Sequence, residues 1–163
     1  MARTIIGVMG RGEGASEEET RAAFELGALI AREGWALLTG GRSAGVMDAA
    51  ARGAKSEGGL TLGVLPGETA AGASDALDIA ILTGLGQARN NVNVLTSRVV
   101  FSCGVGAGTA SEIALALKAK RSVILLCASV EARAFFQSLD ADRVFVAETP
   151  REAVEIARRL LRD

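Results

Sequence analysis

Residues 98–120 read RVVFSCGVGAGTASEIALALKAK, and the fold class follows most directly from them. It opens with an apolar run typical of a buried strand, continues through a glycine-rich turn at 104–108, and ends in an alanine- and leucine-rich helical pattern. We predict a strand over 98–102 and a helix over 109–120. A strand followed by a glycine-rich turn and a helix forms the first part of a β-α-β unit, from which α/β sheets are built. Such sheets bind ligands at the carboxyl ends of their strands.

The same alternation extends over the whole chain. Several predicted strands, such as 122–127, are apolar throughout, as expected when helices cover both faces of a parallel sheet. The alternation predicts an α/β fold with a doubly wound, mainly parallel sheet of about seven strands and helices on both faces. The length of 163 residues, without a linker or internal repeat, favours one domain over 1–163. The predicted strands are 4–9, 35–39, 60–65, 78–82, 98–102, 122–127 and 143–147, and the predicted helices are 17–33, 46–57, 87–97, 109–120, 130–139 and 150–162.

Composition excludes several kinds of chemistry. The chain has no histidine, which rules out Ser-His-Asp and Cys-His catalysis and histidine-ligated zinc. Cys103 and Cys127 lack metal-ligand spacing, so we expect reduced thiols and no metal site. The net charge of −1 and the aromatic content of 4% argue against a nucleic-acid partner.

The cysteines, taken as reduced, predict a cytoplasmic protein, and the hydrophobic pattern predicts no membrane partner. No apolar run approaches the roughly 20 residues of a membrane helix. The N-terminal apolar run 4–9 is shorter than the apolar region of a signal peptide, so it is predicted to be the first strand. The stretch 66–76 is small and polar, which predicts a flexible loop beside a site.

Glycines concentrate where three predicted strands pass to helices, at 10–14, 40–45 and 104–108. In an open α/β sheet these turns share the carboxyl edge, where backbone N–H groups and helix N-termini bind phosphate. Tight turns alone would explain any one loop, but three together favour a site for a phosphate-bearing ligand. The absence of a Walker lysine argues against ATP hydrolysis. The glycine spacing and the missing acidic residue after the second strand argue against a dehydrogenase.

Glu112 has two interpretations. The segment Thr109-Ala110-Ser111-Glu112 matches a capping box, with Thr109 as the N-cap and Glu112 as its reciprocal partner. Similar boxes are predicted at 16–19 and 149–152. A carboxylate one turn into a helix that follows a glycine loop also suits a base or a cation stabiliser in a site. The pattern leaves both interpretations open.

Residues 87–94 read QARNNVNV and hold all three asparagines of the chain. Asparagine is unfavourable inside helices, so the cluster needs a reason. Amide groups could read the edge of a base or pterin, and Arg89 could bind a phosphate through two hydrogen bonds. A solvated helix start with asparagine capping is the alternative. We favour a functional role for Arg89 and Asn90 and not for Asn91.

Three segments resemble the Lonely Guy (LOG) superfamily in sequence and order: GGRSAGVM at 40–47, Arg89-Asn90, and GAGTASE at 106–112. The family hallmark is P-G-G-x-G-T-x-x-E. This chain keeps G-x-G-T-x-x-E, with Gly104 and Val105 in place of the proline and first glycine. The fuller match, from about 4 to 127 and including SEIALALK at 111–118, is similar to the molybdenum-cofactor carrier branch. Members were often labelled "possible lysine decarboxylase", but no pyridoxal-type lysine site is visible here.

The resemblance implies a Rossmann-like fold that forms homodimers or larger assemblies. In LOG enzymes a nucleoside 5′-monophosphate loses its base by hydrolysis of the N-glycosidic bond, and Arg89 and Glu112 match the catalytic arginine and glutamate. In carrier-type relatives the same edge holds the cofactor's phosphate and pterin without turnover. We therefore expect a binding protein for a phosphate-bearing small molecule such as molybdenum cofactor or a nucleotide, with no cofactor required for chemistry. A phosphoribohydrolase is the alternative.

The loops and the resemblance together name the expected ligand-binding residues. They are Gly10, Arg11, Gly40, Gly41, Arg42, Gly45, Met47, Asn90, Gly104, Gly106, Ala107, Gly108 and Thr109.

Overall fold

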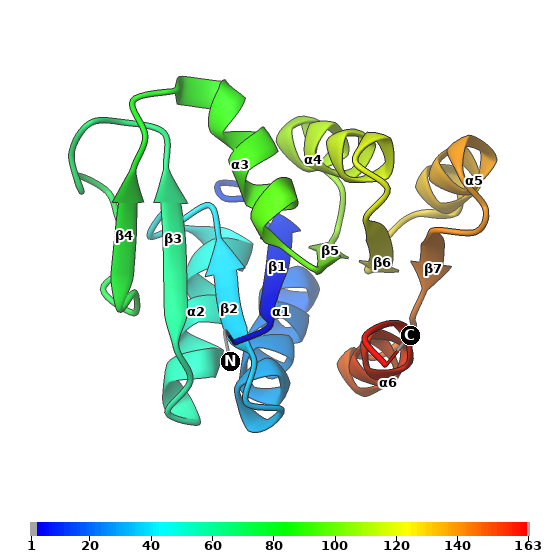
Figure 1. The fold of residues 1–163 in the computed structure, drawn as a ribbon, viewed down its shortest axis with the longest axis horizontal. Coiled ribbons are helices and arrows are strands. Elements are labelled where there is room, and N and C mark those ends of the chain that lie inside the picture. The colour runs from blue at the N-terminus through cyan, green and yellow to red at the C-terminus, as the bar shows by residue number, and fades with distance from the viewer. Residues whose placement is uncertain (1–2, 163) are drawn as a thin grey trace.

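One parallel sheet organises the computed structural model, which describes residues 3–162 (Figure 1). Within this range seven strands lie in the order β4-β3-β2-β1-β5-β6-β7, and every neighbouring pair is parallel. This confirms the predicted doubly wound α/β fold. The strands are β1 (Ile5–Gly10), β2 (Ala36–Thr39), β3 (Thr61–Leu65), β4 (Ile79–Leu82), β5 (Val99–Cys103), β6 (Ser122–Leu126) and β7 (Val144–Val146).

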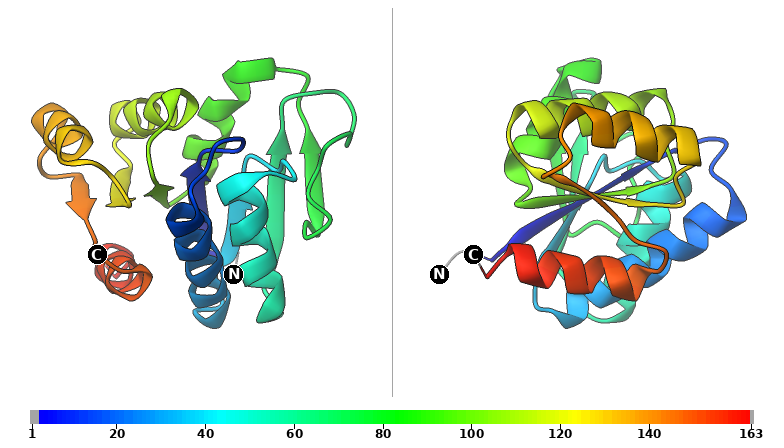
Figure 2. Two further views of the ribbon diagram at one scale, coloured as in Figure 1. Left: turned by 180° about the vertical axis from the view of Figure 1, so that it is seen from behind. Right: turned by 90° about the vertical axis from the view of Figure 1, so that its right-hand side faces the viewer.

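Helices cover both faces of this sheet, as Figure 2 shows from the side and from behind. Alternate residues of a strand point to opposite faces, so each central strand contributes to two cores. Val8 of β1 packs in the core beneath α1, α2 and α6, whereas its neighbour Met9 packs in the core beneath α3, α4 and α5. The helices are α1 (Glu17–Arg32), α2 (Gly45–Ser56), α3 (Arg89–Thr96), α4 (Ala107–Lys118), α5 (Val130–Leu139) and α6 (Pro150–Leu160), with a short 3-10 turn η1 (Gly86–Ala88) before α3.

The predicted capping box at 16–19 is present at the start of α1. The Ser16 hydroxyl accepts a hydrogen bond from the Glu19 N–H, and the Glu19 carboxylate accepts one from the Ser16 N–H at 2.8 Å. At the start of α6 the Thr149 hydroxyl accepts from the Glu152 N–H. The local sequence therefore sets where these two helices begin.

The strand order reverses at β1. The chain builds β1 to β4 toward one edge and then crosses to the other side of β1 to build β5, β6 and β7. At such a reversal the connections leaving two neighbouring strands, here β1 and β5, run to opposite sides and leave a crevice at the carboxyl edge. The first and third glycine loops follow these two strands.

The connection between β3 and β4 is the loop predicted at 66–76. Its second half is tied to the second glycine loop, because the Ser43 N–H donates to the Gly72 carbonyl at 2.8 Å and the Ser74 N–H donates to the Gly41 carbonyl at 2.9 Å. The Ser74 hydroxyl also donates to Asp48 of α2 at 2.6 Å. The loop therefore forms one side of the carboxyl edge.

Two further features bear on function. Within the described residues, no helix combines the length and apolar character needed to cross a bilayer. No group of three or more cysteine, aspartate or glutamate side chains in residues 3–162 is arranged to hold a metal ion. Cys103 and Cys127 are both free thiols.

Candidate functional site

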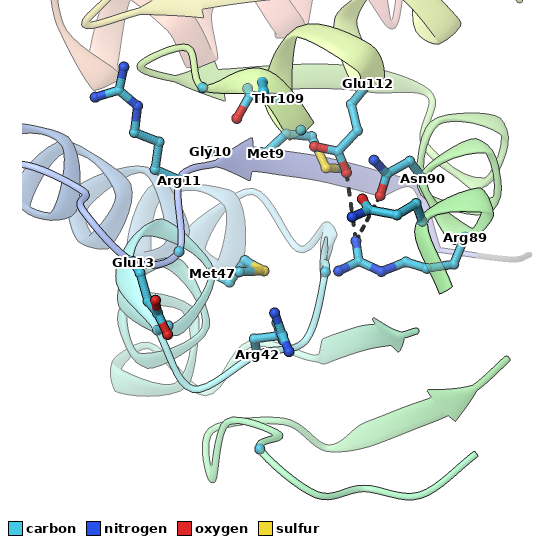
Figure 3. A pocket seen from close by; sticks show the side chains of 18 of the residues that line it. Met9, Gly10, Arg11, Glu13, Arg42, Met47, Arg89, Asn90, Thr109 and Glu112 are labelled. Atoms are coloured by element: carbon cyan, nitrogen blue, oxygen red, sulfur yellow. Dashed lines mark hydrogen bonds and ion pairs between the residues drawn. The ribbon is translucent and has the colours of Figure 1, made fainter. Parts of the chain in front are cut away.

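A cavity of about 700 Å³ opens at the carboxyl edge, where the strand order reverses (Figure 3). It combines parts of all three glycine loops with the start of α3. Most of the residues predicted for a site line it. These are Gly10, Arg11, Gly40, Arg42, Met47, Arg89, Asn90, Gly106, Ala107, Gly108, Thr109 and Glu112.

Gly41, Gly45 and Gly104, which were also predicted, do not line the cavity. All three have positive φ, from +51° to +79°, a conformation that L side chains rarely adopt. At Gly45 a Cβ would lie 2.1 Å from the Gly12 carbonyl oxygen, so the absence of a side chain lets the first glycine loop pack on the start of α2. These three glycines shape the turns that place the lining residues.

The helix N-termini at the cavity have free backbone donors. α2 and α4 have no side-chain cap, in contrast to α1, α5 and α6. Among residues 3–162, the N–H groups of Ala107, Gly108 and Thr109 have no hydrogen-bond partner, and Ala110 is the first residue of α4 bonded to a backbone carbonyl, that of Gly106. Three N–H groups without partners at the positive end of a helix dipole are chemically suited to bind an anion.

Arginines add positive charge to this edge. Arg42 and Arg89 point toward the centre of the cavity, whereas the guanidinium of Arg11 lies on the far side (Figure 3). Arg11 donates to the Val105 carbonyl at 2.7 Å and so ties the first glycine loop to the third. Burial, together with the nearby charge of Arg42, lowers the pKa of Arg89, although Glu112 opposes this effect. Two arginines that face the same cavity favour a ligand that carries negative charge.

Glu112 lies at the floor of the cavity and is 6% exposed. Its Oε1 accepts a hydrogen bond from Asn93 Nδ2 at 2.9 Å and lies 3.8 Å from Arg89 Nη1. The same Arg89 nitrogen donates to Asn90 Oδ1 at 3.1 Å, and Asn90 in turn donates to Ser111 on α4 at 3.0 Å. This network joins the starts of α3 and α4 beside the cavity.

The capping interpretation of Glu112 is wrong. α4 begins two residues earlier than predicted, at Ala107, with Gly106 as its N-cap. Thr109 therefore lies in the third position of the helix, and Glu112 lies beyond the first turn, too far along to bond back to the cap. Glycine at 106 adopts the extended conformation of an N-cap without needing a side-chain partner. Glu112 is instead a member of the cavity floor.

Burial raises the pKa of Glu112 to about 7, against the opposing effects of the hydrogen bond from Asn93 and the charge of Arg89. The carboxyl therefore titrates near neutrality rather than near its ordinary value of 4.5.

This shift predicts a pH dependence of stability. The folded state binds the Glu112 proton more tightly than the unfolded chain, so protonation of Glu112 stabilises the fold. This stabilisation of the fold is complete at pH values below the ordinary pKa of the carboxyl and is lost as pH rises through about 7. Between about pH 5 and pH 8, we expect the free energy of unfolding of the natural sequence to fall by on the order of 2 kcal/mol more than that of Glu112→Gln. Urea denaturation of both proteins at each pH measures the difference. Parallel pH profiles for the two proteins would contradict the assignment.

Sequence reasoning missed one residue that contacts Glu112 and several that line the cavity. Asn93 is fully buried and contacts Glu112, yet nothing in the asparagine cluster distinguished it from Asn91. Its spacing of four from Arg89, which places both on one helix face, is the signal that could have identified it. The residues that line the cavity and were not predicted are Met9, Gly12, Glu13, Ser43, Ala44, Gly72 and Gln87.

Comparison with known proteins finds relatives over the whole chain. A family model described as the SLOG cluster4 family matches residues 3–154. An uncharacterized protein of Archaeoglobus fulgidus is 45% identical over 149 residues, which cover 91% of each chain. The structure of a molybdenum cofactor binding protein from Rippkaea orientalis is similar with a TM-score of 0.97 and 50% identity over 99% of both chains. A molybdenum cofactor carrier protein from Chlamydomonas reinhardtii is 52% identical, with a TM-score of 0.94 over 99% of this chain and 100% of its own.

Proposed function

The chain belongs to the SLOG cluster4 family, and from this premise we propose that it binds and carries a phosphate-bearing small molecule, such as molybdenum cofactor or a nucleotide. The resemblance to the LOG superfamily near the molybdenum-cofactor carrier branch is confirmed by the family match and by the related structures. Those related structures are of proteins that bind or carry molybdenum cofactor, which favours this cofactor as the cargo.

One observation carries the proposal: the same cavity contains backbone N–H groups without hydrogen-bond partners and an arginine, Arg42, that has no ion-pair partner among the described residues. The N–H groups of Ala107, Gly108 and Thr109 have no partner within the described residues. Arg42 lies in the same cavity, exposed and beside Arg89. Backbone donors at a helix N-terminus and a guanidinium are both suited to phosphoryl oxygens. The amides of Asn90 and Gln87 on the α3 side provide donors and acceptors for a heterocycle.

Binding of anaerobically prepared molybdenum cofactor to the purified protein tests the proposal. We expect up to one cofactor per chain and saturable binding. Arg42→Ala is expected to weaken binding by about tenfold or more, because a hydrogen bond to a charged group is worth about 1.5–3 kcal/mol. Arg151→Ala, which removes an exposed arginine of α6, is the matched control and is expected to bind as the natural sequence does. Equal binding by both variants would contradict the assignment of this cavity.

A phosphoribohydrolase is the second candidate, and one observation favours it. The Glu112 carboxyl, with a pKa of about 7, lies 3.8 Å from Arg89 inside the same cavity. A carboxylate there could stabilise an oxocarbenium-like centre or orient water while the helix N-terminus holds the 5′-phosphate. Release of free base from nucleoside 5′-monophosphates, lost in Glu112→Gln, would establish this activity. Under the carrier proposal no base is released.

We also propose that the protein forms a homo-oligomer. The edge strand β4 has all four residues exposed, and Ile79, Leu82 and the following Leu85 are 45%, 46% and 52% exposed. An apolar edge strand with unpaired backbone groups is a surface that a second copy of the chain could cover. Light scattering should then give at least twice the mass of one chain.

We further propose a cytoplasmic location. We also propose that the protein has no nucleic-acid partner, in keeping with its net charge of −1.

A further inference from the structure

We infer that the negative charge of a bound ligand is matched by a proton taken up at Glu112, so that anion binding at the cavity is linked to protonation. The inference rests on the proposed anion-binding function and deepens it. It starts from the position of Glu112, a carboxyl 6% exposed at the floor of a cavity of about 700 Å³ whose other walls carry arginines and free N–H groups.

Glu112 has one cationic neighbour. Arg89 Nη1 lies 3.8 Å from its Oε1, and the side chain of Arg89 is itself only 11% exposed. Both groups are removed from water, so each depends on the other for compensation of its charge. Arg42 is the next cation, close enough to Arg89 to lower its pKa.

The other elements packed against α4 bring no titratable group to this carboxyl. The described residues of β1 and β6 carry none, and Cys103 of β5 packs in the core on the opposite face of the sheet. Asn90 and Asn93 of α3 are neutral. On α4 itself, on α5 and at the rim of the cavity there are further charged groups. They are Lys118 at the far end of α4, Glu131 and Arg133 on α5, and Arg11 and Glu13 at the exposed rim.

An anion at the cavity changes this balance in two ways. It competes for the guanidinium of Arg89, and it adds negative charge near a carboxyl that water does not screen. Because burial raises the pKa of Glu112 to about 7, little additional negative charge is needed to protonate it at neutral pH. Protonation therefore removes the repulsion that would otherwise oppose the ligand.

Asn93 provides a partner for the protonated form. Its Nδ2 donates to Glu112, while its Oδ1 is buried with no hydrogen-bond partner among the described residues. Rotation of the amide by about 180° exchanges these two atoms, so that Oδ1 accepts from a protonated carboxyl. The pair can thus satisfy either protonation state without moving a helix.

Sulfate tests the linkage, because it remains a dianion across the pH range of the experiment and brings no proton of its own. Its affinity is measured by titration at pH 6 and pH 8 at constant ionic strength. Proton exchange is measured calorimetrically near pH 7.5 in two buffers with different ionisation enthalpies. For the natural sequence we expect the Kd to rise about fivefold from pH 6 to pH 8, with net proton uptake on binding. In Glu112→Gln we expect neither the pH dependence nor the uptake.

Glu13→Gln is the matched control, since Glu13 is the other carboxylate lining the cavity and is exposed. This variant is expected to retain proton uptake. Sulfate binding that is equal at pH 6 and pH 8, or a pH dependence that persists in Glu112→Gln, would overturn the linkage while leaving the anion site in place. Absence of sulfate binding at both pH values would overturn the anion site and the linkage together.

Discussion

Replacing Gly108 by aspartate is expected to abolish anion binding while leaving the protein at least as stable as the natural sequence. Gly108 is the second residue of α4 and lines the cavity. Its N–H has no partner in the described chain, and a Cβ built there meets no atom within 4 Å. An aspartate in the first turn of a helix is favoured by the helix dipole, and glycine is a poor helix residue. The fold therefore tolerates the change.

The same carboxylate occupies the position that the anion needs. Like charges brought together in a binding site cost several kcal/mol, which corresponds to a loss of affinity of about a hundredfold or more. Gly108→Ala has nearly the same backbone effect without the charge, so its loss of affinity is expected to be much smaller. Sulfate titration and urea denaturation of both variants separate the two effects. Retained sulfate affinity in Gly108→Asp would place the anion elsewhere.

The second large effect is expected at Gly53, where Gly53→Ala should destabilise the fold by about 3 kcal/mol or more. α1 and α2 contact one another through their backbones at two glycines. A Cβ on Gly53 would lie 1.9 Å from the Phe24 carbonyl oxygen, and one on Gly27 would lie 2.0 Å from that of Ala50. The helices would have to separate to admit the methyl group, and the core beneath them would lose its packing.

Gly108→Ala is the matched control for this substitution too, because it makes the same change in a helix with open space around the Cβ. Alanine is favoured over glycine in helices by up to about 1 kcal/mol, so this control is expected to leave stability unchanged or slightly higher. Urea denaturation measures both. If Gly53→Ala is as stable as the natural sequence, the close approach of α1 and α2 is not required for stability.

The local sequence pattern was sufficient to predict the strands and helices and the edge of the sheet at which the site lies. Each of the seven predicted strands is present within one or two residues of its predicted bounds. Continuous apolar runs suit the central strands, which are covered on both faces, and β4 has the same apolar pattern although its residues are exposed at the edge. The loops at 10–14, 40–45 and 104–108 follow parallel strands, and the carboxyl ends of parallel strands lie at one edge. Most of the predicted site residues therefore line one cavity.

The start of α4 shows where local pattern is insufficient. The motif T-x-x-E matches a capping box equally well whether or not the helix begins at its threonine. The structure begins the helix at Ala107 instead, which frees three N–H groups toward the cavity and carries Glu112 below them. A helix start depends on how the preceding loop packs, and this loop packs against Arg11 from a turn nearly a hundred residues earlier.

The α/β class, the order of the elements and the residue types at the carboxyl edge can be read from the amino-acid sequence alone, because they follow from periodicity, turn residues and composition. The packing of the folded chain was needed to show which glycines line the cavity and which shape its turns. It also placed Asn93 and Arg89 of α3 against Glu112 of α4 and gave that carboxyl a pKa near 7. Distances between residues far apart in the chain and the removal of a carboxyl from water depend on the packing of whole elements, which no local pattern specifies.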